Sequence, residues 1–232
     1  MASLRTIAWS SVARKLINGI TGLGLCCFII IHLAGNLTLL TGNARAFNAY
    51  SHFLLSTGIL IYAAEIGLLG FFLFHALAGV TVWWGKLKAR PEPYHFTVAA
   101  GKPSRKTISS RTMIYTGAIM LVFTVLHLIT FKYGPGVKEG YVMEIDGVAV
   151  RDLYRLSIEV FSKLGYVIWY VGAMALLGFH LRHGAWSGFQ SLGVNHPRYT
   201  PIIYGIALLF ALVMAIGFLA IPIIIYLRGG AA

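Results

Sequence analysis

Five long apolar stretches with almost no charged residues dominate the sequence. The hydrocarbon layer of a membrane is about 30 Å thick, and a helix crosses it in about 20 residues. Because lipid offers the backbone no hydrogen-bond partner, and the alternating pattern of a β-barrel is missing, each stretch predicts a transmembrane helix. We therefore expect an all-α membrane protein, a single domain over residues 1–232, with helices at about Ile17–Thr41, Thr57–Trp84, Thr112–Phe131, Leu164–Trp186 and Pro201–Leu227.

The composition excludes the soluble classes of protein. Hydrophobic residues make up 58% of the chain and charged residues 11%, whereas a soluble domain has about 25% charged residues. Too few polar side chains remain to cover a surface facing water, and a disordered chain needs low hydrophobicity. A disulfide scaffold is excluded as well, because the only two cysteines are the neighbours Cys26 and Cys27.

The basic residues predict the orientation of the helices. The net charge is +12, but the basic residues lie in short connections, where membrane orientation explains them more simply than nucleic-acid binding. Twelve of the 19 lie on the side of the N-terminus, and seven lie on the other side, where five acids offset them. The N-terminus is therefore expected in the cytoplasm and the C-terminus outside. The first residues are too polar for a cleavable signal, so we expect them to be retained.

Four of the eight histidines fall inside the predicted spans, one in each of the first four: His32, His75, His127 and His180. A single histidine at such a place could be a satisfied polar residue of the core. Ionisable residues inside a membrane are costly, however, and generally mark function. One histidine in each of four consecutive helices therefore indicates a shared functional role.

The depths of these histidines divide them into two pairs. With a rise of about 1.5 Å per residue, His32 and His127 each lie roughly 23 Å from the cytoplasmic end of their helices. His75 and His180 lie closer to that end, at roughly 14 Å and 9 Å. Two helices that each offer one imidazole at a common depth suit a bis-histidine haem in a helix bundle. We expect the first four helices to form that bundle, with an outer haem on His32 and His127 and a haem nearer the cytoplasm on His75 and His180.

Other metal centres fit the pattern less well. Zinc takes three or four clustered ligands, often with thiolates. Copper and di-iron sites use cysteine, methionine or carboxylates beside histidine, and a proton relay needs a chain of acids. Glu65 is the one acid inside the predicted spans.

Two further residues are candidates for the same chemistry. His183 shares a helix face with His180 and could contact a haem propionate or a quinone, although a wet interfacial histidine has the same pattern. Glu65 lies near the predicted level of the outer haem and could exchange protons with a bound quinone; a carboxylate facing a wet cavity is the alternative. His52, His95 and His196 fall in the predicted connections, and the connection 132–163 is expected outside, with a short interfacial helix leading into the fourth span.

Six stretches of the sequence carry a resemblance to a known family: SSVARKLINGITGLGL, HLAGNLTLLTG, AFNAYSHFL, SSRTMIYTG, VLHLITFKYG and HLRHGAWSGFQSLG. With them the chain resembles the single-polypeptide, di-haem cytochrome b anchor of bacterial succinate dehydrogenases and fumarate reductases, the menaquinone-linked kind with five membrane helices. The likeness covers nearly the whole chain. Any one stretch alone would be weak, and together they are specific.

The resemblance implies both the haem ligands and the partners. His32 and His127 would ligate the distal haem b, and His75 and His180 the proximal one. The cytoplasmic face would dock an iron–sulfur subunit that carries a flavoprotein subunit, where succinate and fumarate interconvert, and electrons would pass through the two haems to or from menaquinone in the bacterial cytoplasmic membrane. Some fumarate reductases of the family carry a glutamate for proton transfer two residues before the fourth ligand. Here that position is Gly178, which favours succinate oxidation.

Two other readings of the sequence remain open. The chain could be the haem b anchor of another quinone-linked oxidoreductase, such as a hydrogenase or a formate dehydrogenase, which use intramembrane histidines at other motif spacings. It could also be a haem-free transporter with polar histidines. A Rossmann fingerprint and a cysteine-rich cluster motif are both missing from the sequence, so any dicarboxylate chemistry would belong to a partner subunit.

Overall fold

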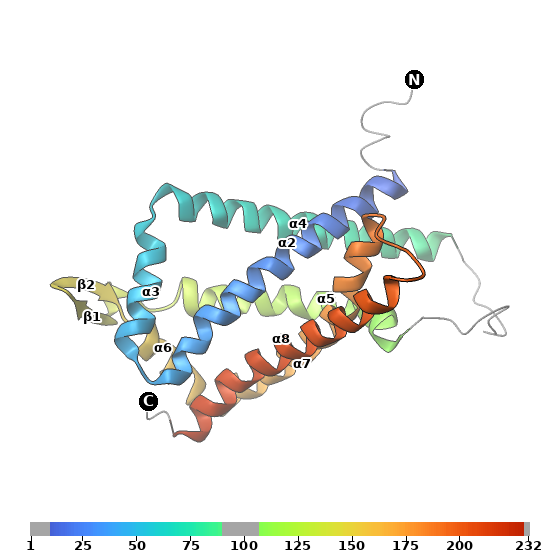
Figure 1. Cartoon of the computed structure of the whole chain (residues 1–232). Coiled ribbons are helices and arrows are strands. Elements are labelled where there is room, and N and C mark those ends of the chain that lie inside the picture. Colours follow the sequence, from blue (N-terminus) through green and yellow to red (C-terminus); the bar gives the residue numbers. More distant parts are fainter. Residues whose placement is uncertain (1–9, 90–106, 230–232) are drawn as a thin grey trace.

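The computed structural model describes residues 10–89 and 107–229. Within these residues it contains seven α-helices and one two-stranded sheet (Figure 1). Five helical segments are long and apolar enough to cross a membrane, so the chain is a multi-pass membrane protein, as predicted. They are α2 (Ser11–Leu37) with its 3-10 extension η1 (Thr38–Thr41), α4 (Ile59–Lys88), α5 (Ile108–His127) with its π-helical extension η2 (Leu128–Lys132), α7 (Leu164–Ser191) and α8 (Thr200–Leu227).

Several of these helices are longer than their apolar stretches because polar residues cap them outside the hydrophobic run. The Ser10 hydroxyl accepts a hydrogen bond from the Ala13 amide at 3.2 Å, and α2 therefore begins six residues before Ile17. Thr107 caps α5 in the same way. The start of α4 moves in the opposite direction, from the expected Thr57 to Ile59, because Gly58 has a positive φ of 61° that no helix continues through.

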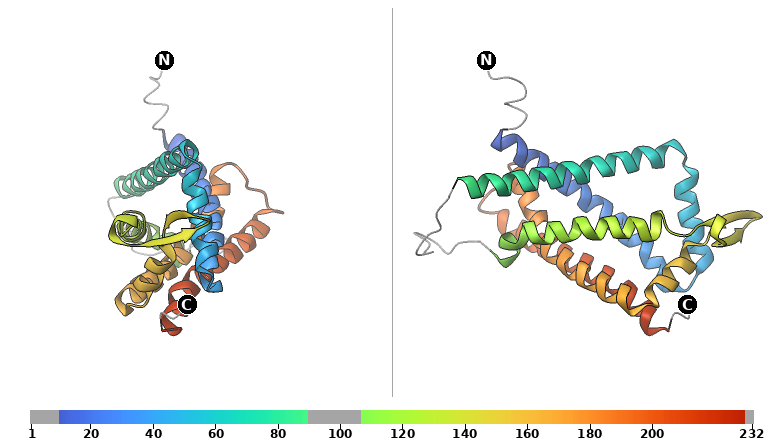
Figure 2. Two further views of the ribbon diagram at one scale, coloured as in Figure 1. Left: turned by 90° about the vertical axis from the view of Figure 1, so that its left-hand side faces the viewer. Right: turned by 180° about the vertical axis from the view of Figure 1, so that it is seen from behind.

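A compact cap covers one end of the spanning helices (Figure 2). It consists of α3 (Ala44–Ser56), the hairpin of β1 (Val142–Ile145) and β2 (Val148–Arg151), and α6 (Leu153–Phe161), with the short η3 (Val137–Glu139) before the hairpin. The helix expected just before the fourth span is confirmed as α6. Neither α3 nor the hairpin was predicted. The hairpin turns at Asp146 and Gly147, whose φ values of 51° and 77° are both positive, as a tight type I′ turn requires.

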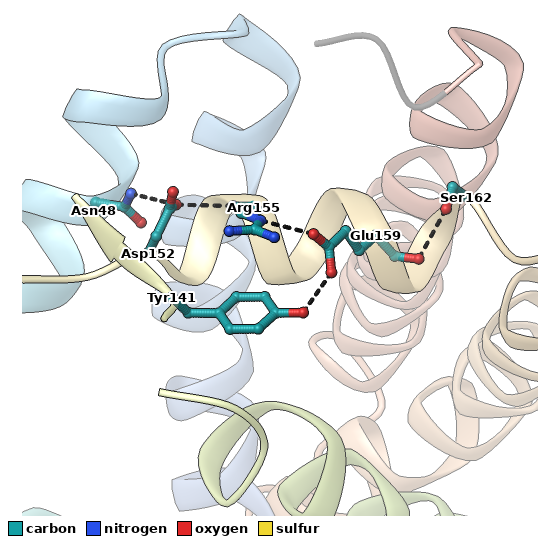
Figure 3. A network of polar contacts seen from close by, with 6 residues as sticks. All are labelled: Asn48, Tyr141, Asp152, Arg155, Glu159 and Ser162. Atoms are coloured by element: carbon teal, nitrogen blue, oxygen red, sulfur yellow. Dashed lines mark hydrogen bonds and ion pairs between the residues drawn. The ribbon is translucent and has the colours of Figure 1, made fainter. Parts of the chain in front are cut away.

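A buried amide ties the two halves of the cap together (Figure 3). The side chain of Asn48 on α3 is fully buried, and its amide donates to the Asp152 carboxylate at 2.8 Å. Its oxygen accepts from the backbone N–H of Tyr154 at 2.9 Å. Asp152 also accepts from the backbone N–H of Arg155 at 2.9 Å and so caps α6. One side chain of α3 therefore fixes the first turn of α6.

The spanning helices pack in a ring with one incomplete side. In the described residues, α2 packs along α4 and α7, α5 packs along α7, and α4 touches α5 only over a short stretch. The diagonal helices of this ring, α2 with α5 and α4 with α7, make at most a minor contact with each other within that part of the chain. Helix α8 lies outside the ring along α7 and α2, and the start of α2 and the end of α8 lie at opposite ends of the molecule (Figure 1).

Candidate functional site

The structure brings the four intramembrane histidines together as two pairs. The ring centroids of His32 on α2 and His127 on α5 lie 5.8 Å apart. Those of His75 on α4 and His180 on α7 lie 6.2 Å apart. Each pair therefore bridges one diagonal of the ring of helices, where the helices themselves make at most a minor contact. We call His32 and His127 the cap-side pair, and His75 and His180 the far-side pair.

The spacing within each pair matches two imidazoles on opposite sides of one metal ion. Metal–imidazole nitrogen bonds are about 2 Å long, and a ring centroid lies about 1 Å beyond its ligating nitrogen, so two axial imidazoles have centroids about 6 Å apart. The two pairs have centroid distances of 5.8 and 6.2 Å. In the described part of the chain, no group of three or more His, Cys, Asp or Glu side chains comes together in a way that could hold a metal ion.

Hydrogen bonds fix the tautomers of the far-side pair. The Nδ1 atom of His75 lies 3.3 Å from the backbone oxygen of Asn18, and a carbonyl can only accept, so this Nδ1 carries the proton. The Nδ1 atom of His180 lies 3.1 Å from the Thr116 hydroxyl. When that hydroxyl directs its single proton to the backbone oxygen of Thr112 or of Met113, each at 3.1 Å, it accepts from His180. In both rings the lone pair is left on Nε2, the atom that a metal would need.

The cap-side pair lies among aromatic rings. The Tyr170 hydroxyl is 3.2 Å from Nδ1 of His127, and within the described residues the ring of His32 has no hydrogen-bond partner. Phe28 stacks on His32 at a centroid distance of 5.2 Å, and Phe123 stacks on His127 at 5.6 Å. This pair is therefore held by packing as well as by hydrogen bonding.

A glycine gives the far-side pair its clearance. A Cβ atom on Gly22 of α2 would lie 3.0 Å from Cε1 of His75, which is tighter than most side-chain contacts in proteins. Gly117 of α5 faces His180 with a corresponding distance of 3.6 Å. Both helices that lack a histidine at this level thus present a glycine to it, and the space beside the rings stays open.

Basic and unpartnered polar atoms gather at the end of the bundle away from the cap. A hollow of about 300 Å³ is lined there by residues that include Arg14, Lys15 and Lys86. Within the described residues, the buried Nε of Arg14 and the buried hydroxyl of Ser109 have no hydrogen-bond partner. Buried polar groups are normally paired, so this end of the molecule suits an anionic group.

The remaining candidates are placed more loosely. His183 is half-buried beside the ring of Trp186, with 5.3 Å between the two centroids, one turn beyond His180. Glu65 forms an ion pair with Lys132, which joins α4 to η2. His52 lies on α3 rather than in a connection, and His196 lies in the connection before α8. His95 is outside the described residues.

Sequence reasoning missed the residues that support the histidines. Phe28 and Phe123 could have been found, because each precedes its histidine by four residues and so lies on the same helix face. Thr116 and Tyr170 gave no such signal, because each bonds to a histidine on another helix.

Comparison with family models, curated proteins and solved structures finds no match to the chain.

Proposed function

We propose that this chain is the membrane anchor and electron-transfer subunit of a succinate:menaquinone oxidoreductase, with two bis-histidine haems b. The observation that carries the proposal is the pair of histidines on each diagonal of the helix ring, with centroids 5.8 and 6.2 Å apart. Haem ligation explains why each of two diagonally opposite helices offers one imidazole to the other, in two pairs with similar spacing. A haem-free transporter would have no need of two such histidine pairs.

The donor set fits the two haems. When bound, each haem supplies one-electron redox chemistry. The iron atoms would be held by His32 and His127 on the cap side and by His75 and His180 on the far side. The carbonyl of Asn18 and the hydroxyl of Thr116 keep the far-side imidazoles in the ligating tautomer. The basic end near Arg14, together with His183, is suited to the propionates of the far-side haem.

The proposed orientation places the cap outside a bacterial cytoplasmic membrane and the far end in the cytoplasm. This follows from the excess of basic residues on the side of the N-terminus and the positive-inside rule. An iron–sulfur subunit, which carries the flavoprotein subunit, docks on the cytoplasmic face next to the far-side haem. The two haems would supply the one-electron carriers between that subunit and menaquinone, whose proposed site includes Glu65. Succinate oxidation takes place on the flavoprotein, so this chain is a subunit of the enzyme without its dicarboxylate site.

The proposal is tested by purifying the chain from its native membrane with whatever subunits remain attached. We expect a flavoprotein and an iron–sulfur protein to copurify, and succinate to reduce b-type haem in the complex. Reduction by dihydrogen or formate, but not by succinate, would assign the chain to another oxidoreductase. A purified chain without b-type absorption bands would refute the haem sites altogether.

A further inference from the structure

An ion pair closes the incomplete side of the helix ring near the cap. Helices α4 and α5 touch only over a short stretch, yet the Lys132 ammonium donates to the Glu65 carboxylate across them. Both side chains remain more than one-third exposed. Lysine has three donors, and within the described residues Glu65 is the only hydrogen-bond partner of this ammonium group. Two donors of Lys132 are therefore available to a ligand.

A break in the helix pattern brings Lys132 to this position. In an α-helix, a residue five places after His127 would point about 140° away from it. Directly after His127, however, the chain continues as the π-helical η2, where the Tyr133 amide donates to the Leu128 oxygen at 2.9 Å. A π-turn includes an extra residue, so Lys132 comes back toward the helix face of His127. Such turns often occur at functional sites.

The cap holds the end of η2 in place. Arg151, at the end of β2, donates to the backbone oxygens of Lys132, Gly134 and Pro135 at 3.2, 3.0 and 2.9 Å. These carbonyls lie at and beyond the end of the π-turn and would otherwise lack partners. One guanidinium group therefore fixes the segment that presents Lys132.

The ion pair lies at the edge of the membrane and close to the cap-side histidines. Helix α4 is about 45 Å long, which exceeds the hydrocarbon layer by about 15 Å. Glu65 is six residues, about 9 Å, from its cap-side end. Lys132 is about 7 Å along the helix axis from His127. Charged groups inside a membrane are costly and generally mark function, and a ligand bound by this partly exposed ion pair would lie near the cap-side pair.

The geometry points to Lys132 as the residue that binds the carbonyl oxygen of a quinone headgroup, with Glu65 holding its ammonium group in position. This inference rests on the proposed function and adds to it the residue that contacts the ligand. A quinone carbonyl only accepts hydrogen bonds, so it needs a donor. Lys132 supplies that donor, and the Glu65 carboxylate cannot supply it while ionised.

The test measures binding of a tail-less 1,4-naphthoquinone to the purified full chain, with its haems, by the change that the ligand causes in the absorption spectrum or the tryptophan fluorescence. We expect Lys132→Met to raise the Kd by about tenfold or more, because a charge-assisted hydrogen bond is lost. Glu65→Gln, which releases the ammonium group, also raises the Kd. Lys132→Arg keeps a cationic donor and restores binding to within about threefold of the wild type.

The matched control is Arg45→Gln, which removes the exposed ion pair with Asp146 on the cap and leaves the Kd unchanged. An unchanged Kd in Lys132→Met or in Glu65→Gln, with b-type bands intact, would overturn the inference and leave the proposed function standing. Should Lys132→Met fail to accumulate, Glu65→Gln alone decides between these results. Absence of b-type bands from the wild type would instead remove the proposed function on which the inference rests.

Discussion

At the scale of single residues, the hydrogen-bond partner of Nδ1 determines whether Nε2 of an imidazole is available to bind a metal. When Thr116 donates its single hydroxyl proton to a backbone oxygen of its own helix, it accepts from His180. Because His180 must then carry its proton on Nδ1, its Nε2 is a ligand without any further rearrangement. A hydrogen bond of this kind also makes the imidazole a stronger donor to a metal.

Replacing Thr116 by valine removes the acceptor behind His180. We expect the reduction potential of the far-side haem to rise, because a weaker imidazole donor stabilises the ferric state less. If this hydrogen bond stabilises the ferric state by about 1 kcal/mol more than the ferrous state, its loss corresponds to a shift of roughly 40 mV. A redox titration followed optically checks this, with Thr116→Ser as the control that keeps the hydroxyl. Equal shifts of both haems, or none, would show that Thr116 does not act through His180.

The identity of the histidines could be predicted from the sequence, but not the residues behind them. His32, His75, His127 and His180 share two depths that follow directly from counting residues along each helix. Thr116 and Tyr170 act across helices separated by 64 and 43 positions in the chain. Which residues face each other across a bundle depends on helix rotation, and the nearly uniform apolar character of these spans does not reveal it.

At the scale of elements, the cap shows how a few polar residues place a connection over the end of a bundle. Asp146 and Gly147 give a strong hairpin signal, and the alternation around them is short but visible in the sequence. The contact between Asn48 and Asp152, in contrast, spans 104 positions and could not be predicted. Because nothing in the sequence predicts that contact, the packing of α3 on α6 could not be expected either.

Asn48→Ala should loosen the cap. The substitution leaves the Asp152 carboxylate and the Tyr154 amide without their buried partner, at a cost of about 1–3 kcal/mol. We expect a lower thermal midpoint and faster proteolysis in the hairpin 142–151. Arg45→Gln breaks only an exposed ion pair and should change stability by less than about 1 kcal/mol. Similar effects of the two substitutions would contradict the role given to Asn48.

The stability of the cap should also depend on pH through Glu159. The Tyr141 hydroxyl and then the Arg155 guanidinium, at 2.5 and 2.7 Å, hold the pKa of this carboxyl below its ordinary value. A lowered pKa in the folded state means that the stabilisation is present above the unfolded pKa of about 4.3 and is lost as the pH falls through the folded value. Thermal midpoints of wild type and Glu159→Gln should therefore differ at pH 7 and converge in acid. A constant difference would exclude this linkage.

At the scale of the whole molecule, the proposed function depends on which end faces the cytoplasm. Lys88 ends α4 at the far end, and Asp146 lies at the tip of the hairpin on the cap. In a background with Cys26→Ala and Cys27→Ala, we expect Asp146→Cys to react with a membrane-impermeant thiol reagent in intact cells. Lys88→Cys should react only after the membrane is opened. The reverse pattern would place the cap in the cytoplasm and remove the docking face from the far end.

The most direct measurement of the central claim is the amount of haem b per chain in purified wild type and in single His→Ala variants. Two diagonal pairs predict two haems in the wild type. They predict one haem after substitution of His75 or His180, and one spectrally different haem after substitution of His32 or His127. Two haems retained in any of these variants, or no haem in the wild type, would contradict ligation by the pairs described.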